Sequence, residues 1–97
     1  MAQCLCGKVI IEIKKVNNHY ICRCNKCKIT SGSNSIKWIC IENKDFQINN
    51  TKHYKIYKSS KYGRRGFCSN CGSNLTMKYT NYPKFVWVTN MSIENKN

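Results

Sequence analysis

Eight cysteines in a chain of 97 residues constrain the fold more than any other feature of the sequence. Seven of them fall in three clusters, CLC at 4–6, CRCNKC at 22–27 and CSNC at 68–71. A domain of this length buries only a modest apolar core, and many such domains need disulfides, bound metal or a partner to be stable. The clusters therefore indicate that cysteine chemistry stabilises this fold.

The start of the chain favours metal over disulfides. It lacks the basic segment and long apolar run of a secretion signal, because Glu12 interrupts the apolar residues 9–13. In a reducing compartment the thiols would stay free to bind metal. We therefore expect a cytoplasmic protein. We expect no membrane association, since no apolar run reaches the roughly 18 residues of a membrane helix.

The first and last clusters each form half of a metal site. A CxC or CxxC turn can direct both sulfurs at one ion, and the glycine that follows each pair can adopt left-handed backbone angles that turn amide donors toward the sulfurs. Two half-sites give the four thiolates that Zn²⁺ prefers in structural sites. We predict one zinc ligated by Cys4, Cys6, Cys68 and Cys71. A disulfide within either pair is the alternative, but it would close only a short loop.

The middle cluster offers three ligands, Cys22, Cys24 and Cys27. Three thiolates leave the fourth position of Zn²⁺ open for water or substrate, which is typical of catalytic zinc. We predict a second, more labile zinc here and assign catalysis to these cysteines. Basic neighbours such as Arg23 and Lys26 would attract an anionic thiol. The alternatives are a fourth protein ligand that closes the site, or a site without metal.

Three other potential ligands are assigned differently. Cys40 lies in an apolar run between two isoleucines, where cysteine usually behaves as a small buried hydrophobic residue. A fourth ligand for the middle cluster is the alternative role for Cys40. His19 and His53 are isolated in their segments, and we expect surface or hydrogen-bonding roles for both.

Short β-branched and aromatic runs, separated by Asn, Gly and Ser, predict an all-β single domain of antiparallel strands. In the run at 35–41, alternation places Trp38 and Cys40 on one face and Ile39 and Ile41 on the other, so both faces are expected to be partly covered. The expected strands are 8–13, 19–23, 35–41, 45–48, 53–59, 74–79 and 84–89.

The formal charge of +13 makes nucleic acid a candidate partner. Aromatic and basic residues alternate in HYKIYKSSKYGRR at 53–65, which could stack on bases and contact phosphates. However, Lys, Asn and Ile, all written with A- and T-rich codons, account for 38 of the 97 residues. The basic excess therefore has a compositional explanation, and nucleic acid is the less favoured partner.

Several motifs together resemble the glutathione-dependent formaldehyde-activating enzyme family, abbreviated GFA. They are CLCGKV, CRCNKCKITSGS, Trp38, Phe46, YKSSKYGRRGFCSNCGSNL and VTNMSIEN, which occur in the order and approximate spacing of that family. The vertebrate centromere protein V resembles the same family. The likeness covers Cys4 to about Glu94. Family members usually continue further, so we expect residues 1–97 to form a single GFA-like domain without the C-terminal extension.

The resemblance implies a fold of coiled antiparallel sheets held by zinc. It also implies a structural zinc at Cys4, Cys6, Cys68 and Cys71 and an active-site zinc at Cys22, Cys24 and Cys27. Family enzymes are carbon–sulfur lyases that act on S-hydroxymethylglutathione, the adduct of glutathione and formaldehyde.

The leading functional hypothesis is accordingly a lyase for a glutathione–aldehyde adduct, with a small thiol such as glutathione as partner. Arg64 and Arg65 are candidate contacts for the carboxylates of the thiol, and an exposed surface pair is the alternative. None of the four acids lies within a cysteine cluster, so no carboxylate base is predicted. The alternative function is a non-catalytic basic zinc module that binds nucleic acid or chromatin.

Overall fold

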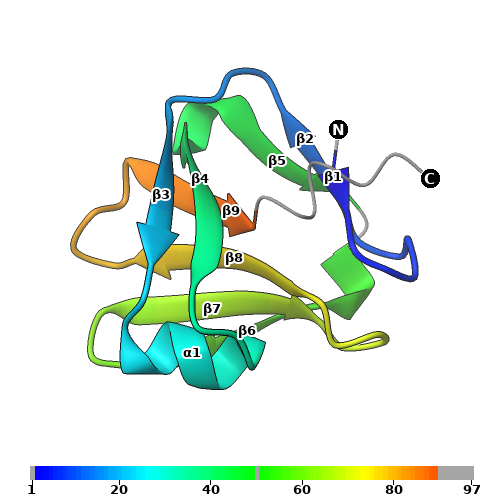
Figure 1. The fold of residues 1–97 in the computed structure, drawn as a ribbon. Helices are drawn as coiled ribbons and strands as arrows, with labels where there is room; N and C mark the ends of the chain where they lie inside the picture. The colour runs from blue at the N-terminus through cyan, green and yellow to red at the C-terminus, as the bar shows by residue number, and fades with distance from the viewer. Residues whose placement is uncertain (1, 50, 90–97) are drawn as a thin grey trace.

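Short antiparallel strands make up most of the structure, a computed structural model that describes residues 2–49 and 51–89 (Figure 1). The described strands are β1 (Ala2–Gln3), β2 (Ile10–Ile13), β3 (Asn18–Cys22), β4 (Ile36–Glu42), β5 (Phe46–Asn49), β6 (Tyr54–Lys58), β7 (Gly63–Cys68), β8 (Asn74–Tyr79) and β9 (Phe85–Thr89). One α-helix, α1 (Asn25–Ser31), and 3-10 turns at Asn43–Asp45 and Thr51–His53 complete the described elements. All seven predicted strands are present, and the predicted mainly β fold is confirmed.

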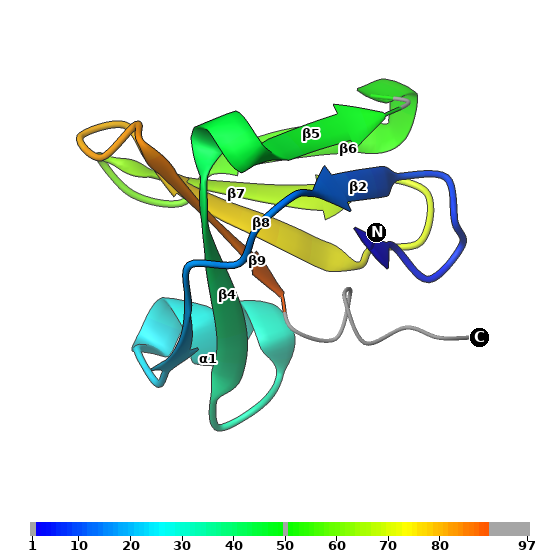
Figure 2. The same cartoon turned by 90° about the horizontal axis from the view of Figure 1, so that it is seen from above.

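The strands form two antiparallel sheets. The small sheet has the order β1-β2-β5, and the large sheet has the order β3-β4-β9-β8-β7-β6. Figure 1 shows the large sheet strongly coiled, with β3 and β4 running crosswise to β7 and β8. Figure 2, seen from above, shows β2 and β5 stacked over the strands of the large sheet. The two sheets therefore enclose a core between them.

That core consists of ten buried residues. Ile11 from the small sheet packs with Ile39, Leu75 and Val88 of the large sheet, and Cys4 and Cys68 belong to the same cluster. The other members are Ala2, Val9, Ile41 and Val86. Because two of the predicted metal ligands sit in this core, the first cysteine site is continuous with the hydrophobic interior.

Strand β4 is buried on both faces. Ile39 and Ile41 face the main core, while Trp38 packs in a second cluster with Cys27 and Met77. This confirms the predicted coverage of both faces. The second face is the one that carries the middle cysteine cluster.

The short strand β1, the two 3-10 turns, helix α1 and strand β7 were not predicted. Helix α1 escapes a periodicity search because it has seven residues, among them Ile29 and Thr30, whose β-branched side chains favour strands. Strand β7 contains two glycines and two arginines, a composition unusual for a strand. It is an interior strand nonetheless, paired with both β6 and β8.

No helix among the described residues is long and apolar enough to cross a membrane. The last residues of the VTNMSIEN motif, Glu94 included, lie outside the described residues. The expectation about a C-terminal extension also concerns a part of the chain outside them.

Candidate metal centres

The first site brings together four cysteines from opposite ends of the chain. Cys4 and Cys6 lie in the turn after β1, while Cys68 ends β7 and Cys71 lies in the turn before β8. All four sulfurs lie within 4.8 Å of one another. The two pairs of cysteines therefore meet, and they join the small sheet to the large one.

The sulfur distances in this site suit a tetrahedral metal ion. Cys6 Sγ lies 3.6 Å from Cys4 Sγ and 3.7 Å from Cys68 Sγ. Four sulfurs at about 2.3 Å from a central Zn²⁺ are separated by about 3.8 Å. The four-thiol donor set and its spacing therefore fit a metal ion, consistent with zinc.

The glycines after each pair have the predicted backbone angles, with φ of 79° at Gly7 and 80° at Gly72. Their own amides, however, donate to the carbonyl oxygens of Cys4 and Cys68 and so close the two turns. Amides of other residues donate to the sulfurs, among them that of Val9, 3.3 Å from Cys4 Sγ. The glycines therefore shape the turns, and a later amide reaches the thiol.

Two thiols of this site, those of Cys68 and Cys71, have opposite pKa shifts. Burial raises the pKa of Cys68 to about 11. Burial also opposes ionisation of Cys71, but hydrogen bonds from the Ser73 hydroxyl and from backbone amides lower its pKa to about 5. Metal ligation requires thiolates. An ion at this site would therefore displace protons chiefly from the buried thiol of Cys68.

The second site forms at the start of α1. Cys22 ends β3, Cys24 is the N-cap of the helix, and Cys27 lies in its first turn with its side chain buried. Cys24 Sγ accepts a hydrogen bond from the Cys27 amide at 3.4 Å, as a serine or asparagine cap would. The CxCxxC spacing suits this geometry, because the first turn of α1 brings Cys27 back toward the N-cap Cys24. There the Cys27 sulfur also lies beside that of Cys22, at the end of β3.

The three sulfurs of this cluster also lie within 4.8 Å of one another. Cys22 Sγ is 3.4 Å from Cys24 Sγ and 2.9 Å from Cys27 Sγ, short enough for thiol hydrogen bonds. Burial raises the pKa of Cys22 to about 12, whereas the Cys27 amide lowers that of Cys24 to about 7. Among the described residues, no fourth Cys, His, Asp or Glu joins this cluster.

Arg65 connects β7 to this second site. Its side chain is buried, with only 9% of the residue exposed. Nη2 donates to Cys27 Sγ at 3.8 Å and Nη1 to Thr30 Oγ1 at 3.5 Å. A buried guanidinium beside Cys27 would offset the negative charge of a three-thiolate metal site.

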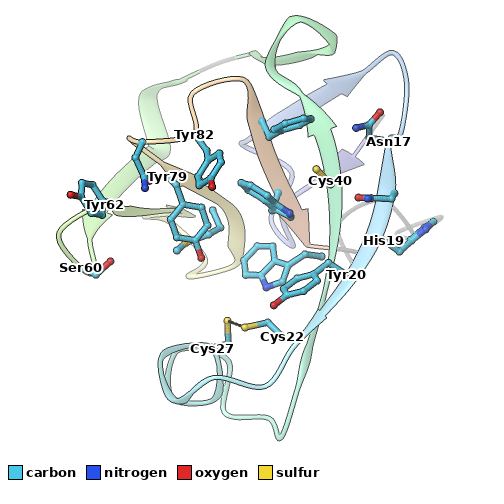
Figure 3. A pocket seen from close by; sticks show the side chains of 16 residues that line it. Asn17, His19, Tyr20, Cys22, Cys27, Cys40, Ser60, Tyr62, Tyr79 and Tyr82 are labelled. Carbon is cyan, nitrogen blue, oxygen red and sulfur yellow. Dashed lines mark hydrogen bonds between the residues drawn. The ribbon is translucent and has the colours of Figure 1, made fainter.

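A cavity of about 710 Å³ opens beside the three-cysteine cluster (Figure 3). In Figure 3, the sulfurs of Cys22 and Cys27 lie at the bottom of the view, below Tyr20. Ser60, Tyr62, Tyr79 and Tyr82 lie on the left, and Asn17, His19 and Cys40 lie on the right. The remaining residues that line the cavity are Asn18, Trp38, Met77, Asn81, Phe85 and Trp87. The cluster therefore faces a space large enough for a small-molecule ligand.

The remaining predicted residues fall as follows. Cys40 is buried in β4 and belongs to neither cluster, as expected for a small apolar residue. Neither His19 nor His53 joins a cluster. Arg64 donates to backbone carbonyl oxygens in the turn between β6 and β7, while Arg65 is the residue that reaches the site.

The aromatic cavity is the functional feature that sequence reasoning missed. Its residues come from β3, β4, β8, β9, helix α1 and three connecting segments, and no local pattern connects them. The one available signal was Trp38, which shares a strand face with Cys40 away from the main core.

Known proteins resemble this chain both in sequence and in fold. The family model described as "Glutathione-dependent formaldehyde-activating enzyme" matches residues 1–97. An uncharacterized lyase of Schizosaccharomyces pombe is 33% identical over 82 residues, which cover 80% of this chain and 56% of that protein. The matched segment thus spans little more than half of the relative.

A crystal structure of a Rhodobacter sphaeroides protein superposes with a TM-score of 0.81 at 20% sequence identity. The match covers 99% of this chain and 89% of that one. At this identity the likeness shows a shared fold.

Proposed function

The chain belongs to the glutathione-dependent formaldehyde-activating enzyme family, and we propose that it is a carbon–sulfur lyase that cleaves or forms adducts of a thiol, such as glutathione, with an aldehyde. The observation that carries this proposal is the three-cysteine cluster facing a ligand-sized cavity. A cluster with three sulfurs, and no fourth ligand among the described residues, leaves room for the sulfur of a substrate.

The site residues would have distinct roles. Cys22, Cys24 and Cys27 would hold the ion, and a zinc bound there would supply Lewis acidity toward the sulfur or oxygen of the adduct. Arg65 would offset the charge of the thiolates through its contact with Cys27. Tyr20 and Trp38, beside the cluster, would cover the substrate and exclude water.

The reaction itself demands little proton chemistry from the protein. Cleavage of a thiohemiacetal breaks its carbon–sulfur bond and moves one proton from its hydroxyl to its sulfur, with no change in oxidation state. No Asp or Glu among the described residues lines the cavity. The chain would therefore contribute mainly by holding the sulfur beside the cluster and orienting the hydroxyl.

The test combines metal analysis with an exchange measurement. Protein purified under reducing conditions should contain two zinc ions per chain. It should accelerate exchange between glutathione, formaldehyde and their adduct, measured by NMR, over the uncatalysed rate. Cys24→Ser should abolish the acceleration, while Tyr57→Ala, which changes an exposed side chain outside both clusters and the cavity, should retain it. No acceleration by the zinc-loaded protein would refute the proposal.

The nucleic-acid alternative rests on the segment at 53–65, and the structure divides its side chains among several environments. Tyr54 donates or accepts a hydrogen bond inside the sheet with Thr76, Tyr62 lines the cavity, and Arg65 is buried. This leaves fewer basic and aromatic groups for one binding face than the sequence predicts. Salt-dependent binding of a DNA or RNA duplex, insensitive to Cys24→Ser, would favour this alternative.

A further inference from the structure

The cavity beside the three-cysteine cluster is free of Lys, Arg, Asp and Glu along its described lining, although the chain carries 17 basic residues. Its polar lining groups are amides, hydroxyls, thiols and the imidazole of His19. Basic residues near the cluster, Arg23 and Lys26, are exposed and do not line the cavity. A charged group placed in this space would lose hydration without gaining an ionic partner.

Aromatic rings form much of the cavity lining, and several of them contact one another. Tyr79 meets Trp87 edge to face, with ring centroids 5.4 Å apart, and Phe85 lies 6.3 Å from Trp87. Tyr20 and Tyr82 line the same cavity yet remain largely exposed. Exposed aromatic faces around a hollow are the surface that an uncharged ring or apolar group would cover.

The cavity is much larger than the aldehyde-derived part of a formaldehyde adduct. In a formaldehyde adduct, only a hydroxymethyl group lies beyond the sulfur, and it would fill little of about 710 Å³. The remainder of glutathione carries two carboxylates and an ammonium group, which suit solvent and the exposed basic residues better than an aromatic wall. The occupant should therefore be an uncharged part of the substrate.

We propose that the cavity binds the aromatic group of an aldehyde, so that the preferred substrate is a thiohemiacetal of an uncharged aromatic aldehyde. This inference rests on the proposed lyase function. In the reaction the carbon–sulfur bond breaks, its electron pair stays on sulfur, and the hydroxyl oxygen forms the carbonyl. The hydroxyl proton is transferred to sulfur, so aldehyde and thiol are the products and nothing is oxidised or reduced.

Binding can be tested separately from catalysis, because both tryptophans of the chain, Trp38 and Trp87, line the cavity and make their fluorescence a specific reporter. The probe is benzyl alcohol, which is unreactive, compared with its charged analogue 4-(hydroxymethyl)benzoate. We expect benzyl alcohol to bind at least tenfold more tightly than the charged analogue. The double variant Tyr20→Ala/Tyr82→Ala should weaken benzyl alcohol binding at least fivefold.

The matched control is Tyr57→Ala, since Tyr57 is 65% exposed on β6 and does not line the cavity. It should leave the affinity for benzyl alcohol unchanged. Equal binding of both probes, or no loss in the double variant, would overturn the inference. Exchange rates with benzaldehyde and formaldehyde adducts separate the two proposals. Probe binding without catalysis rejects the lyase, whereas formaldehyde exchange without probe binding rejects only the aromatic substrate.

Discussion

Arg65 reaches from β7 to the three-cysteine cluster through a polar contact with Cys27. It was predicted only as one of an arginine pair, because the sequence cannot show which of two neighbours points inward. In β7 successive side chains alternate between faces, so burial of Arg65 puts Arg64 on the opposite side. Arg65 Nε has no hydrogen-bond partner among the described residues, so the charge is held chiefly by contacts at its Nη atoms.

We predict that Arg65→Met weakens metal binding at this cluster. The substitution preserves much of the side-chain volume but removes the positive charge beside Cys27. Loss of a group that supports a ligand typically lowers metal affinity about 10-fold or more. Titration of the metal-free protein with Co²⁺, in competition with a chelator, measures the affinity, and the sulfur-to-cobalt absorption reports the ligands.

The control for this prediction is Arg64→Met, since Arg64 contacts only carbonyl oxygens of its own turn. It should leave the cobalt affinity of the cluster within about twofold of the parent. Equal affinities in the Arg65 and Arg64 variants would show that Arg65 serves packing alone.

At the scale of elements, β7 depends on Gly66. A Cβ atom at this position would overlap the Thr76 hydroxyl and would lie 2.6 Å from Cε1 of the Tyr54 ring. Those two side chains are hydrogen-bonded to each other across the glycine from β6 and β8. Gly66 made residues 63–68 look unlike a strand in the sequence. In the structure, its lack of a side chain leaves the space in which Tyr54 and Thr76 form their hydrogen bond.

Gly66→Ala should lower the free energy of unfolding by about 3 kcal/mol, because neither neighbour can move without breaking their hydrogen bond. Gly63→Ala is the comparison within the same strand. Its Cβ would meet the ends of three side chains, Ser59, Ser60 and Met77, and moving them would break one hydrogen bond, from the Gly63 amide to Ser60 Oγ. Its cost should be about 1 kcal/mol. Urea unfolding of both variants measures the difference, and equal costs would contradict this account.

A second prediction at the scale of elements concerns helix α1. Cys24 is both a predicted ligand in the three-cysteine cluster and the N-cap of this helix. Serine is a good N-cap, so Cys24→Ser should keep the helix while removing one metal ligand. Cys24→Ala removes ligand and cap together and should cost about 1 kcal/mol more. Urea unfolding of the metal-free variants isolates the cap. Identical stabilities would show that the sulfur does not cap the helix.

The elements also show what sequence can and cannot predict here. Strands with β-branched runs, such as β2, β4 and β9, were predicted because local alternation produces them. Helix α1 and strand β7 were missed because tertiary contacts override their local preferences. Cysteine spacing predicted which cysteines lie together, since each CxC, CxxC or CxCxxC turn is local. The aromatic cavity could not be predicted, because it depends on how the large sheet coils.

At the scale of the whole molecule, the four-cysteine site links two sheets that otherwise meet through one small apolar core. Cys4 and Cys68 are 1% and 0% exposed and are part of that core. The three-cysteine site, in contrast, lies at the edge of the molecule, with Cys24 exposed and α1 beneath the large sheet in Figure 1. The two sites should therefore contribute unequally to folding.

The last prediction is that Cys4→Ser and Cys71→Ser prevent stable folding, whereas Cys24→Ser does so much less. Metal binding to four thiolates supplies about 10 kcal/mol or more, comparable to the whole stability of a small domain. Losing one of these ligands also leaves a polar hydroxyl at Cys4 against the core. Metal content and thermal unfolding by circular dichroism measure the effect. A Cys4→Ser protein that keeps its metal and its thermal midpoint would contradict the structural role of this site. Equal collapse of the Cys24→Ser protein would mean that the three-cysteine cluster also carries the fold, because serine preserves the helix cap and leaves ligation as the only loss.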